Sequence, residues 1–286
     1  MKKLSNYSLK VKNTFHIDGI AENYYVPESE NELSELFNTI KSEKFYILSG
    51  GSNILLDDSK KLKHVIYMSE IDKNFKHISD GCFYIGASLR IQKVINNLNN
   101  LGYGGIEEMY SLPAMFGGII YMNAGIGKKN NPLFTISDFI NKVKTFNIQT
   151  SQIEWIDKEN CMFSHRCSIF QNNKYVILGA ECNFIKQSIE KSKERIKIRL
   201  EKTRRNQEMG KGTFGTCFAE ANPKLLKIIS ILTHRKGKIR FASNNANWFV
   251  NDGNGTFSDC MILIKRCELI HKIFHKNIKR EVRIWE

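Results

Sequence analysis

Apolar residues alternate between helical and extended spacing along the chain. Helices are predicted where apolar side chains recur every three or four residues, at 33–40, 91–98, 188–205, 223–232 and 257–271. Strands are predicted in the short apolar runs at 24–27, 45–48, 65–68, 83–85 and 175–184. Ser29 and Glu32 have the spacing of a capping box, so the first helix should begin there. The pattern predicts a β-α-β start and, from about 70 to 185, one glycine-rich α/β domain.

The helix expected at 188–205 differs from the others because it is strongly charged. Its thin apolar stripe consists of Ile189, Ile196 and Leu200. A narrow stripe buries little of a helix surface. We therefore interpret this helix as a solvated connector that leads into a further domain.

Composition narrows the class of protein. A chain of 286 residues can hold two or three small domains with a real core. Hydrophobic residues at 42% and aromatic residues at 11% argue against disorder. The formal charge of +14 would suit nucleic acid, a membrane surface or an anionic small substrate. The basic residues are spread out, no common nucleic-acid motif occurs, and no run of 18 apolar residues occurs. We expect neither a nucleic-acid nor a membrane partner.

The seven cysteines form an odd set without CxxC spacing. That pattern argues against both a disulfide framework and a zinc site, and it fits a reducing compartment. No metal site is predicted. The start MKKLSNYSLKVKN carries charge but no apolar core after it, so it does not read as a signal peptide. We expect a cytoplasmic protein.

Two glycine-containing segments are candidates for binding a ligand. Residues 111–125 read SLPAMFGGIIYMNAG, and residues 45–53 run from an apolar strand into Ser-Gly-Gly-Ser-Asn. Glycine lets backbone N–H groups face a ligand, and a strand that ends in small residues can cradle a phosphate. The alternative for the first segment is a tight turn before a buried strand at 119–122. Neither GxGxxG nor GxxxxGK[ST] occurs, so the sequence supports neither the Rossmann nor the Walker motif.

Together these segments resemble the flavin-binding elements of UDP-N-acetylenolpyruvoylglucosamine reductases. The resemblance implies an α+β fold of the vanillyl-alcohol-oxidase class, in which two α+β lobes hold FAD and a third α+β domain binds the substrate. The lobes would be residues 1–70 with 272–286, and 71–186, and the substrate domain residues 196–271. It assigns FAD binding to Ser49, Gly50, Gly51, Ser52, Asn53, Ser111, Pro113, Ala114, Gly117, Gly118, Asn123 and Gly125.

Three further segments resemble the catalytic motifs of the same family. HRCSIF at 165–170 carries Arg166, GTFGTCF at 212–218 carries Thr216 where the family has serine, and KREVRI at 279–284 carries Glu281. The resemblance assigns Arg166, Thr216 and Glu281 to catalysis, with Thr216 as proton donor. Cys217 competes for that role because a thiol is a better acid than an alcohol. Substrate contacts are expected from His165, Arg166, Lys211 and Asn222.

Residues 244–252, NNANWFVND, resemble a family strand that reads histidine-alanine-asparagine-phenylalanine-isoleucine-valine-asparagine. The spacing between Arg166 and the GTFGTCF segment leaves no room for a tyrosine-bearing loop, so the chain resembles the subgroup that lacks it.

By resemblance, NADPH delivers a hydride through FAD to UDP-N-acetylglucosamine enolpyruvate, which yields UDP-N-acetylmuramate for peptidoglycan, and we expect a monomer. Alternatives are another FAD oxidoreductase of the same class, such as a sugar or alcohol oxidase, and a basic nucleic-acid-binding protein.

Overall fold

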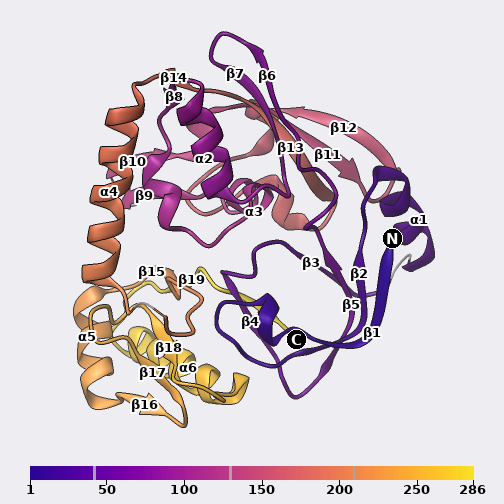
Figure 1. The fold of residues 1–286 in the computed structure, drawn as a ribbon. Coiled ribbons are helices and arrows are strands. Elements are labelled where there is room, and N and C mark those ends of the chain that lie inside the picture. The colour runs from indigo at the N-terminus through magenta and orange to yellow at the C-terminus, as the bar shows by residue number, and fades with distance from the viewer. Residues whose placement is uncertain (41–42, 129–130, 209) are drawn as a thin grey trace. The chain divides into compact units, whose positions relative to one another are not determined.

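The computed structural model describes residues 1–40, 43–128, 131–208 and 210–286. The chain forms two compact units (Figure 1). Unit 1 contains residues 1–3, 25–49 and 66–202, and unit 2 contains residues 4–24, 50–65 and 203–286. The division into two cofactor lobes and a substrate domain stays a prediction.

The amino-terminal part of the chain forms a four-stranded sheet with the order β1-β2-β5-β3. Its strands are β1 (Lys2–Ser8), β2 (Ile20–Val26), β3 (Phe45–Leu48) and β5 (Lys61–Tyr67). Helix α1 (Glu30–Ile40) joins β2 to β3, so the β-α-β start is confirmed. Ser29 Oγ accepts from the backbone N–H of Glu32 at 3.2 Å, whereas the Glu32 carboxylate bonds to the N–H of Glu28 at 2.8 Å. The capping box is therefore only half formed.

Unit 1 is built on a five-stranded antiparallel sheet with the order β12-β11-β13-β7-β6 (Figure 1). These strands are β6 (Phe75–Ser79), β7 (Cys82–Gly86), β11 (Ile140–Asn147), β12 (Gln152–Asp157) and β13 (Tyr175–Asn183). Helices α2 (Ile91–Asn100) and α3 (Phe116–Tyr121) belong to its core, and α3 packs against β7 and β13. The apolar faces meet in a buried cluster that includes Phe83, Leu98, Phe116, Ile120 and Val143.

The helix α3 replaces a strand that one interpretation of the sequence placed at 119–122, and that interpretation is wrong. The glycines of Phe116–Tyr121 lie in its first turn, and glycine is a poor helix former. Packing outweighs that propensity, because a Cβ on Gly117 would stand 2.9 Å from the Cβ of Ala87. Only a glycine lets the helix lie this close to the sheet.

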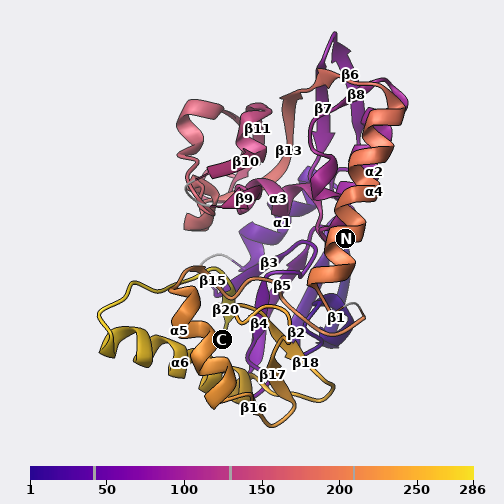
Figure 2. The same ribbon diagram turned by 90° about the vertical axis from the view of Figure 1, so that its left-hand side faces the viewer.

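Unit 2 contains a three-stranded sheet with the order β16-β17-β18 beside helices α5 and α6 (Figure 2). The bounds are β16 (Arg235–Lys236), β17 (Ile239–Phe241), β18 (Phe249–Asn251), α5 (Pro223–Leu232) and α6 (Phe257–Ile273). Two further pairs are β4 (Ile54–Leu56) with β20 (Arg283–Trp285), which are parallel, and β15 (Phe218–Glu220) with β19 (Lys279–Arg280), which are antiparallel. Phe15, Phe214, Phe241 and Phe249 form a chain of ring contacts in its core.

Helix α4 (Ile189–Asn206) confirms the helix predicted at 188–205. Its contacts differ from the predicted thin apolar stripe on a solvated connector. Ile189 at the start of the proposed stripe is 36% exposed. Polar groups anchor the helix in unit 1 instead, since Ser192 is fully buried and Arg195 forms ion pairs with Glu107 and Glu108 at 2.7 and 2.6 Å. The description of this helix as solvated is therefore wrong for its inner face.

The remaining elements are short. They are β8 (Tyr103–Gly104), β9 (Gly125–Lys128), β10 (Asn131–Thr135), β14 (Ile185–Lys186) and 3-10 helices at Lys10–Lys12, Glu107–Ser111, Ile136–Asp138, Lys158–Cys161 and Ile169–Asn172. Within the described ranges, none of the helices is both long enough and apolar enough to cross a membrane.

Candidate active site

Arg166 lies at the tip of a tight turn in unit 1. Ser164 and Cys167 exchange both backbone hydrogen bonds at 3.1 Å, so His165 and Arg166 form the two central residues of a hairpin. The φ angle of Arg166 is +57°, a left-handed conformation that is costly for a residue with a side chain. Its Nη2 donates to the carbonyl oxygen of Gly125 at 3.1 Å. His165 is exposed beside it.

Polar side chains fix this turn on helix α3. Ser168 Oγ and Gln171 Nε2 both donate to the carbonyl oxygen of Tyr121, at 2.7 and 3.0 Å. Gln171 Nε2 also bonds to the carbonyl oxygen of Arg166 at 3.1 Å. Asn123 Nδ2 donates to the carbonyl oxygen of Ser164 at 3.0 Å. The end of the segment predicted to bind FAD thus holds the predicted catalytic arginine in place.

The two segments predicted to bind FAD, residues 111–125 and 45–53, meet at Ser49, the residue that follows strand β3. A Cβ built on Gly118 would lie 3.2 Å from Ser49 Oγ, so these two residues touch within unit 1. Gly125 starts strand β9, where a Cβ would stand 2.7 Å from the carbonyl oxygen of Phe134. Gly117 and Gly125 therefore serve backbone packing, and Gly118 faces Ser49.

Ser111, Pro113 and Ala114 lie on a loop that leads into α3. Gln92 Nε2 donates to the carbonyl oxygen of Leu112 at 2.7 Å, and the carbonyl oxygen of Ala114 accepts from the N–H of Ile91 at 3.1 Å. Ser111 Oγ accepts from Arg199 Nε at 2.8 Å. Burial lowers the pKa of the Arg199 guanidinium, and the negative charge of Glu108 offsets part of this effect. This arginine contact could not be expected from sequence, because it depends on how α4 crosses the loop.

The Gly50-Gly51-Ser52 turn begins the second segment of unit 2. Gly51 has φ +64°, and a Cβ on it would stand 2.0 Å from the carbonyl oxygen of Lys12, so the position requires glycine. Its carbonyl oxygen accepts from the N–H of Thr14 at 3.0 Å. Among the residues that the structure describes, the backbone N–H groups of Gly50, Gly51 and Ser52 donate to no protein acceptor. Three such consecutive donors suit an anionic group.

Thr216 follows Gly215, whose φ is +79°, on a loop of unit 2. The loop is held at both ends, because Thr213 N donates to the carbonyl oxygen of Thr14 at 2.9 Å and Cys217 N donates to that of Asn247 at 2.9 Å. Thr216 Oγ1 accepts a hydrogen bond from Trp248 Nε1 at 3.2 Å. The hydroxyl of Thr216 is half-buried.

Cys217, the competing proton donor, is fully buried. Burial raises the pKa of its thiol well above the ordinary value, and the neighbouring Cys260 and Cys267 raise it further. The thiol is therefore a weaker acid than a free cysteine, which reduces the chemical advantage that favoured it over Thr216.

Glu281 joins the loop of Thr216 to the Gly-Gly-Ser-Asn turn. Its backbone N–H donates to the carbonyl oxygen of Cys217 at 2.8 Å, and its own carbonyl oxygen accepts from Asn53 Nδ2 at 3.1 Å. Parallel pairing of β20 with β4 continues this contact. Unit 2 thus brings together Asn53, Thr216, Cys217 and Glu281, which are distant in sequence.

The predicted substrate residues of unit 2 have protein partners. Lys211 Nζ lies 3.8 Å from Asp252 Oδ1, in an exposed cluster with Arg235 and Arg240. Asn222 Oδ1 caps helix α5 by accepting from the N–H groups of residues 224 and 225, at 3.0 and 3.1 Å. The Asn222 oxygen is therefore committed to the helix.

The predicted site residues fall into two groups. Unit 1 carries Ser49, His165, Arg166 and the whole of segment 111–125, whereas unit 2 carries residues 50–53, Lys211, Thr216, Asn222 and Glu281. No group of three or more potential metal ligands occurs among the described residues. Sequence reasoning missed Trp248, although its indole beside the GTFGTCF loop could have been anticipated from the resemblance of residues 244–252 to a family strand.

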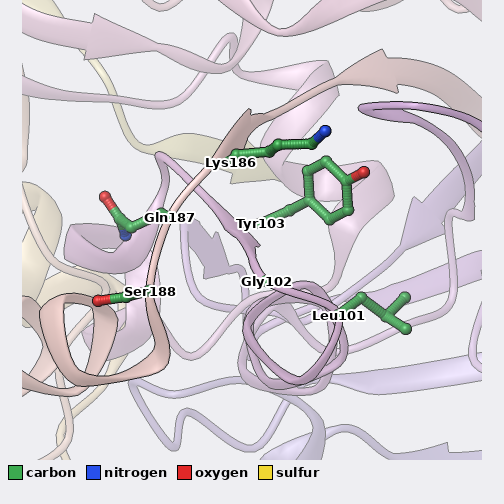
Figure 3. A pocket seen from close by; sticks show the side chains of 6 residues that line it. All are labelled: Leu101, Gly102, Tyr103, Lys186, Gln187 and Ser188. Atoms are coloured by element: carbon green, nitrogen blue, oxygen red, sulfur yellow. The ribbon is translucent and has the colours of Figure 1, made fainter.

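A surface cavity of about 380 Å³ lies elsewhere in unit 1 (Figure 3). Strands β8 and β14 and the end of α2 line it, through Leu101, Gly102, Tyr103, Lys186, Gln187 and Ser188. Tyr103 and Lys186 both bond to Asp80. The cavity contains no residue that the sequence assigned to chemistry.

These features define an α+β protein with the fold of a solved reductase. The crystal structure of UDP-N-acetylenolpyruvylglucosamine reductase from Thermus caldophilus matches with a TM-score of 0.77 and 19% identity, over 100% of this chain and 98% of that one. The fold class expected from the sequence is confirmed. No protein-family model matches the chain.

Curated relatives point to the same family. UDP-N-acetylenolpyruvoylglucosamine reductases are 25% identical in Halalkalibacterium halodurans, over 98% of this chain and 93% of the relative, and 28% identical in Carboxydothermus hydrogenoformans, with the same coverage. The relative from Leptospira interrogans is 26% identical over 91% of this chain and 84% of its own length. The chain is similar to these reductases along nearly its whole length, so the resemblance seen in the sequence is confirmed, whereas the subgroup stays a prediction.

Proposed function

We propose that the protein reduces the enolpyruvyl group of UDP-N-acetylglucosamine enolpyruvate to the lactyl ether of UDP-N-acetylmuramate, a step of peptidoglycan synthesis. The proposal follows from its similarity to reductases named for that substrate. The observation that carries it is the contact in unit 2, where the loop of Thr216, the backbone of Glu281 and the Asn53 turn are joined by direct hydrogen bonds.

The residues present fit a flavin dinucleotide. Three consecutive backbone donors at Gly50, Gly51 and Ser52 offer an anion site in unit 2, and in unit 1 Gly118 adds no side chain beside Ser49. Bound FAD, reduced by NADPH, would supply the hydride. We propose that residues 49–53 and the 111–125 segment hold FAD through these groups, with Asn123 and Gly125 fixing the turn of Arg166.

Addition of a hydride to the terminal carbon of the enol ether leaves negative charge on the adjacent carbon and its carboxylate. Arg166 is suited to bind that carboxylate, because a guanidinium offers parallel donors and a fixed positive charge. Its Nη2 bond to the Gly125 carbonyl oxygen and the bond from Gln171 Nε2 to its own carbonyl oxygen hold Arg166 in the turn. We assign the proton that completes the reduction to Thr216, and we assign to Glu281 the orientation of Arg166 or of a water that carries a proton.

The reduction thus adds one hydride and one proton to the two carbons of the enol C=C bond, and it needs no other oxidant or reductant. We further propose that Lys211 and its basic neighbours attract the diphosphate of the substrate, in competition with Asp252. His165, exposed at the same turn, would contact the substrate beside Arg166.

We propose a monomeric protein of the cytoplasm. All seven cysteines are free thiols, which supports a reducing compartment. Light scattering during gel filtration would test the monomer.

The activity is tested with the purified protein, NADPH and UDP-N-acetylglucosamine enolpyruvate. The proposal predicts that, under anaerobic conditions, NADPH absorbance falls beyond one equivalent per flavin only when the enolpyruvyl substrate is present, with a product heavier by one hydride and one proton. Arg166→Ala should bind FAD as the parent does and yet form little product. If the protein oxidised a sugar or an alcohol instead, the alternative FAD oxidoreductase would replace this proposal.

A further inference from the structure

The side chain that contacts the predicted proton donor belongs to Trp248. Its indole Nε1 lies 3.2 Å from Thr216 Oγ1, and both side chains are half-buried. An indole N–H can only donate, so the threonine oxygen is the acceptor in this bond. The hydroxyl proton of Thr216 must therefore point elsewhere.

The backbone holds the two residues in this position independently of the side-chain bond. Thr216 and Trp248 form an antiparallel bridge. Asn247 closes it from both sides, with its carbonyl oxygen accepting from Cys217 N at 2.9 Å and its side chain bonding to the N–H and carbonyl of Phe218 at 2.9 and 2.8 Å. The indole is thus aimed at the hydroxyl by a rigid frame, which limits the entropy lost in making the bond.

A threonine has a methyl group that restricts its rotamer, so a fixed donor on its oxygen selects one orientation of the hydroxyl.

We propose that Trp248 is a positioning residue for proton donation by Thr216. The proposal rests on the proposed function. During the step, the Oγ1–H bond of Thr216 breaks and a C–H bond forms at the carbon next to the carboxylate, while the hydride occupies the other carbon. The threonine oxygen then bears the negative charge, and the Trp248 N–H stabilises it until solvent returns a proton.

Trp248→Phe keeps the ring and removes the donor, so it is the variant that tests this role. We expect reduction of the flavin by NADPH to stay within about 2-fold of the parent, because Thr216 takes no part in that step. Reoxidation by the enolpyruvyl substrate should slow by about 10- to 100-fold, as expected for loss of a charge-assisted hydrogen bond, with little change in KM. The matched control is Trp155→Phe, since Trp155 lies in unit 1 and has no bond to Thr216.

A double-mutant cycle separates positioning from general damage to the fold. In a Thr216→Ala background, Trp248→Phe should cause no further slowing, because no hydroxyl remains to be oriented. Equal slowing of both half-reactions by Trp248→Phe, or an unchanged reoxidation rate, would overturn the proposal.

The hydrogen bond can also be observed without activity. The chain has three tryptophans, so ¹⁵N-labelled indole gives a simple spectrum. Thr216→Val, which is nearly isosteric, should shift the indole resonance that Trp248→Phe removes and leave the other two in place. If that resonance does not move, Trp248 does not bond to Thr216. If it moves but the parent protein fails to reduce the enolpyruvyl substrate, the bond stands and the proposed function, with the catalytic role built on it, is wrong.

Discussion

Replacement of Glu107 should destabilise the fold. Its side chain is fully buried at the start of a 3-10 helix in unit 1. Oε2 accepts from the N–H of Gly105 at 3.0 Å and lies 2.7 Å from Arg195 Nη1. Oε1 accepts from Gln187 Nε2 at 2.7 Å and from Ser192 Oγ at 3.0 Å. Four donors therefore converge on one carboxylate.

Glu107→Gln preserves the shape and replaces one oxygen by an amide NH₂. If Oε2 is replaced, Arg195 Nη1 faces a donor and the Gly105 N–H keeps only its 3.3 Å contact with Oε1. If Oε1 is replaced, Gln187 Nε2 faces a donor, and the Ser192 hydroxyl must turn to accept. Each buried group left unsatisfied costs about 1–3 kcal/mol. Arg195 keeps the carboxylate of Glu108, which its Nη2 approaches to 2.6 Å, so the loss should stay at or below the roughly 3–5 kcal/mol typical of a broken buried ion pair. We expect the free energy of unfolding to fall by about 3 kcal/mol.

The assay is urea unfolding followed by circular dichroism, with the slope compared between variants to confirm that the same surface is exposed. Glu108→Gln is the matched control, because that carboxylate is partly exposed and also pairs with Arg195, and we expect a loss of about 1 kcal/mol. If Glu107→Gln cost no more than Glu108→Gln, the buried network would not be the anchor of helix α4.

Three further predictions follow from unit 2. Gly51→Ala should lower the melting temperature sharply and abolish flavin binding, because its Cβ would meet a carbonyl oxygen at 2.0 Å. Its control is Gly102→Ala, where φ is +78° but the space is open, and which should lower the free energy of unfolding by only about 1–2 kcal/mol. The Arg240 guanidinium lowers the pKa of Glu208 to about 2. This pair therefore stabilises the fold above pH 4.5, the ordinary pKa of the carboxyl group, and the effect is lost as the pH falls toward 2. Glu208→Gln should reduce the fall in the free energy of unfolding that is measured between these pH values. Cys217→Ala should retain turnover, since the buried thiol has a raised pKa, and loss of product formation would restore it as a candidate donor.

The elements with regular apolar spacing could be predicted from the sequence. Helices α2, α5 and α6 and strands β3 and β13 lie within a few residues of the expected positions, because their burial follows directly from periodicity. Helix α3 could not be predicted, since its two glycines disfavour a helix and only the approach to Ala87 explains them. The inner face of α4 was missed for a related reason: the buried Ser192 and the half-buried Arg195 bond to partners about 85 to 90 residues away in sequence.

The candidate site shows the same limit. Motif positions indicated Arg166, Thr216 and Glu281, but the left-handed backbone of Arg166 and the bond from Trp248 to Thr216 depend on contacts between distant segments. The relative acidity of Thr216 and Cys217 likewise depends on burial. Free-thiol chemistry favoured Cys217, whereas its full burial favours Thr216.

The central claim is that the chain carries FAD and passes a hydride from NADPH to the enolpyruvyl substrate. The most direct measurement is an anaerobic visible spectrum of the purified protein, recorded before NADPH, after NADPH, and after the substrate is added. We expect a flavin spectrum that bleaches with NADPH and returns with UDP-N-acetylglucosamine enolpyruvate. A protein that neither retains nor takes up flavin would contradict it, and the glycine segments at 49–53 and 111–125 would then be structural turns.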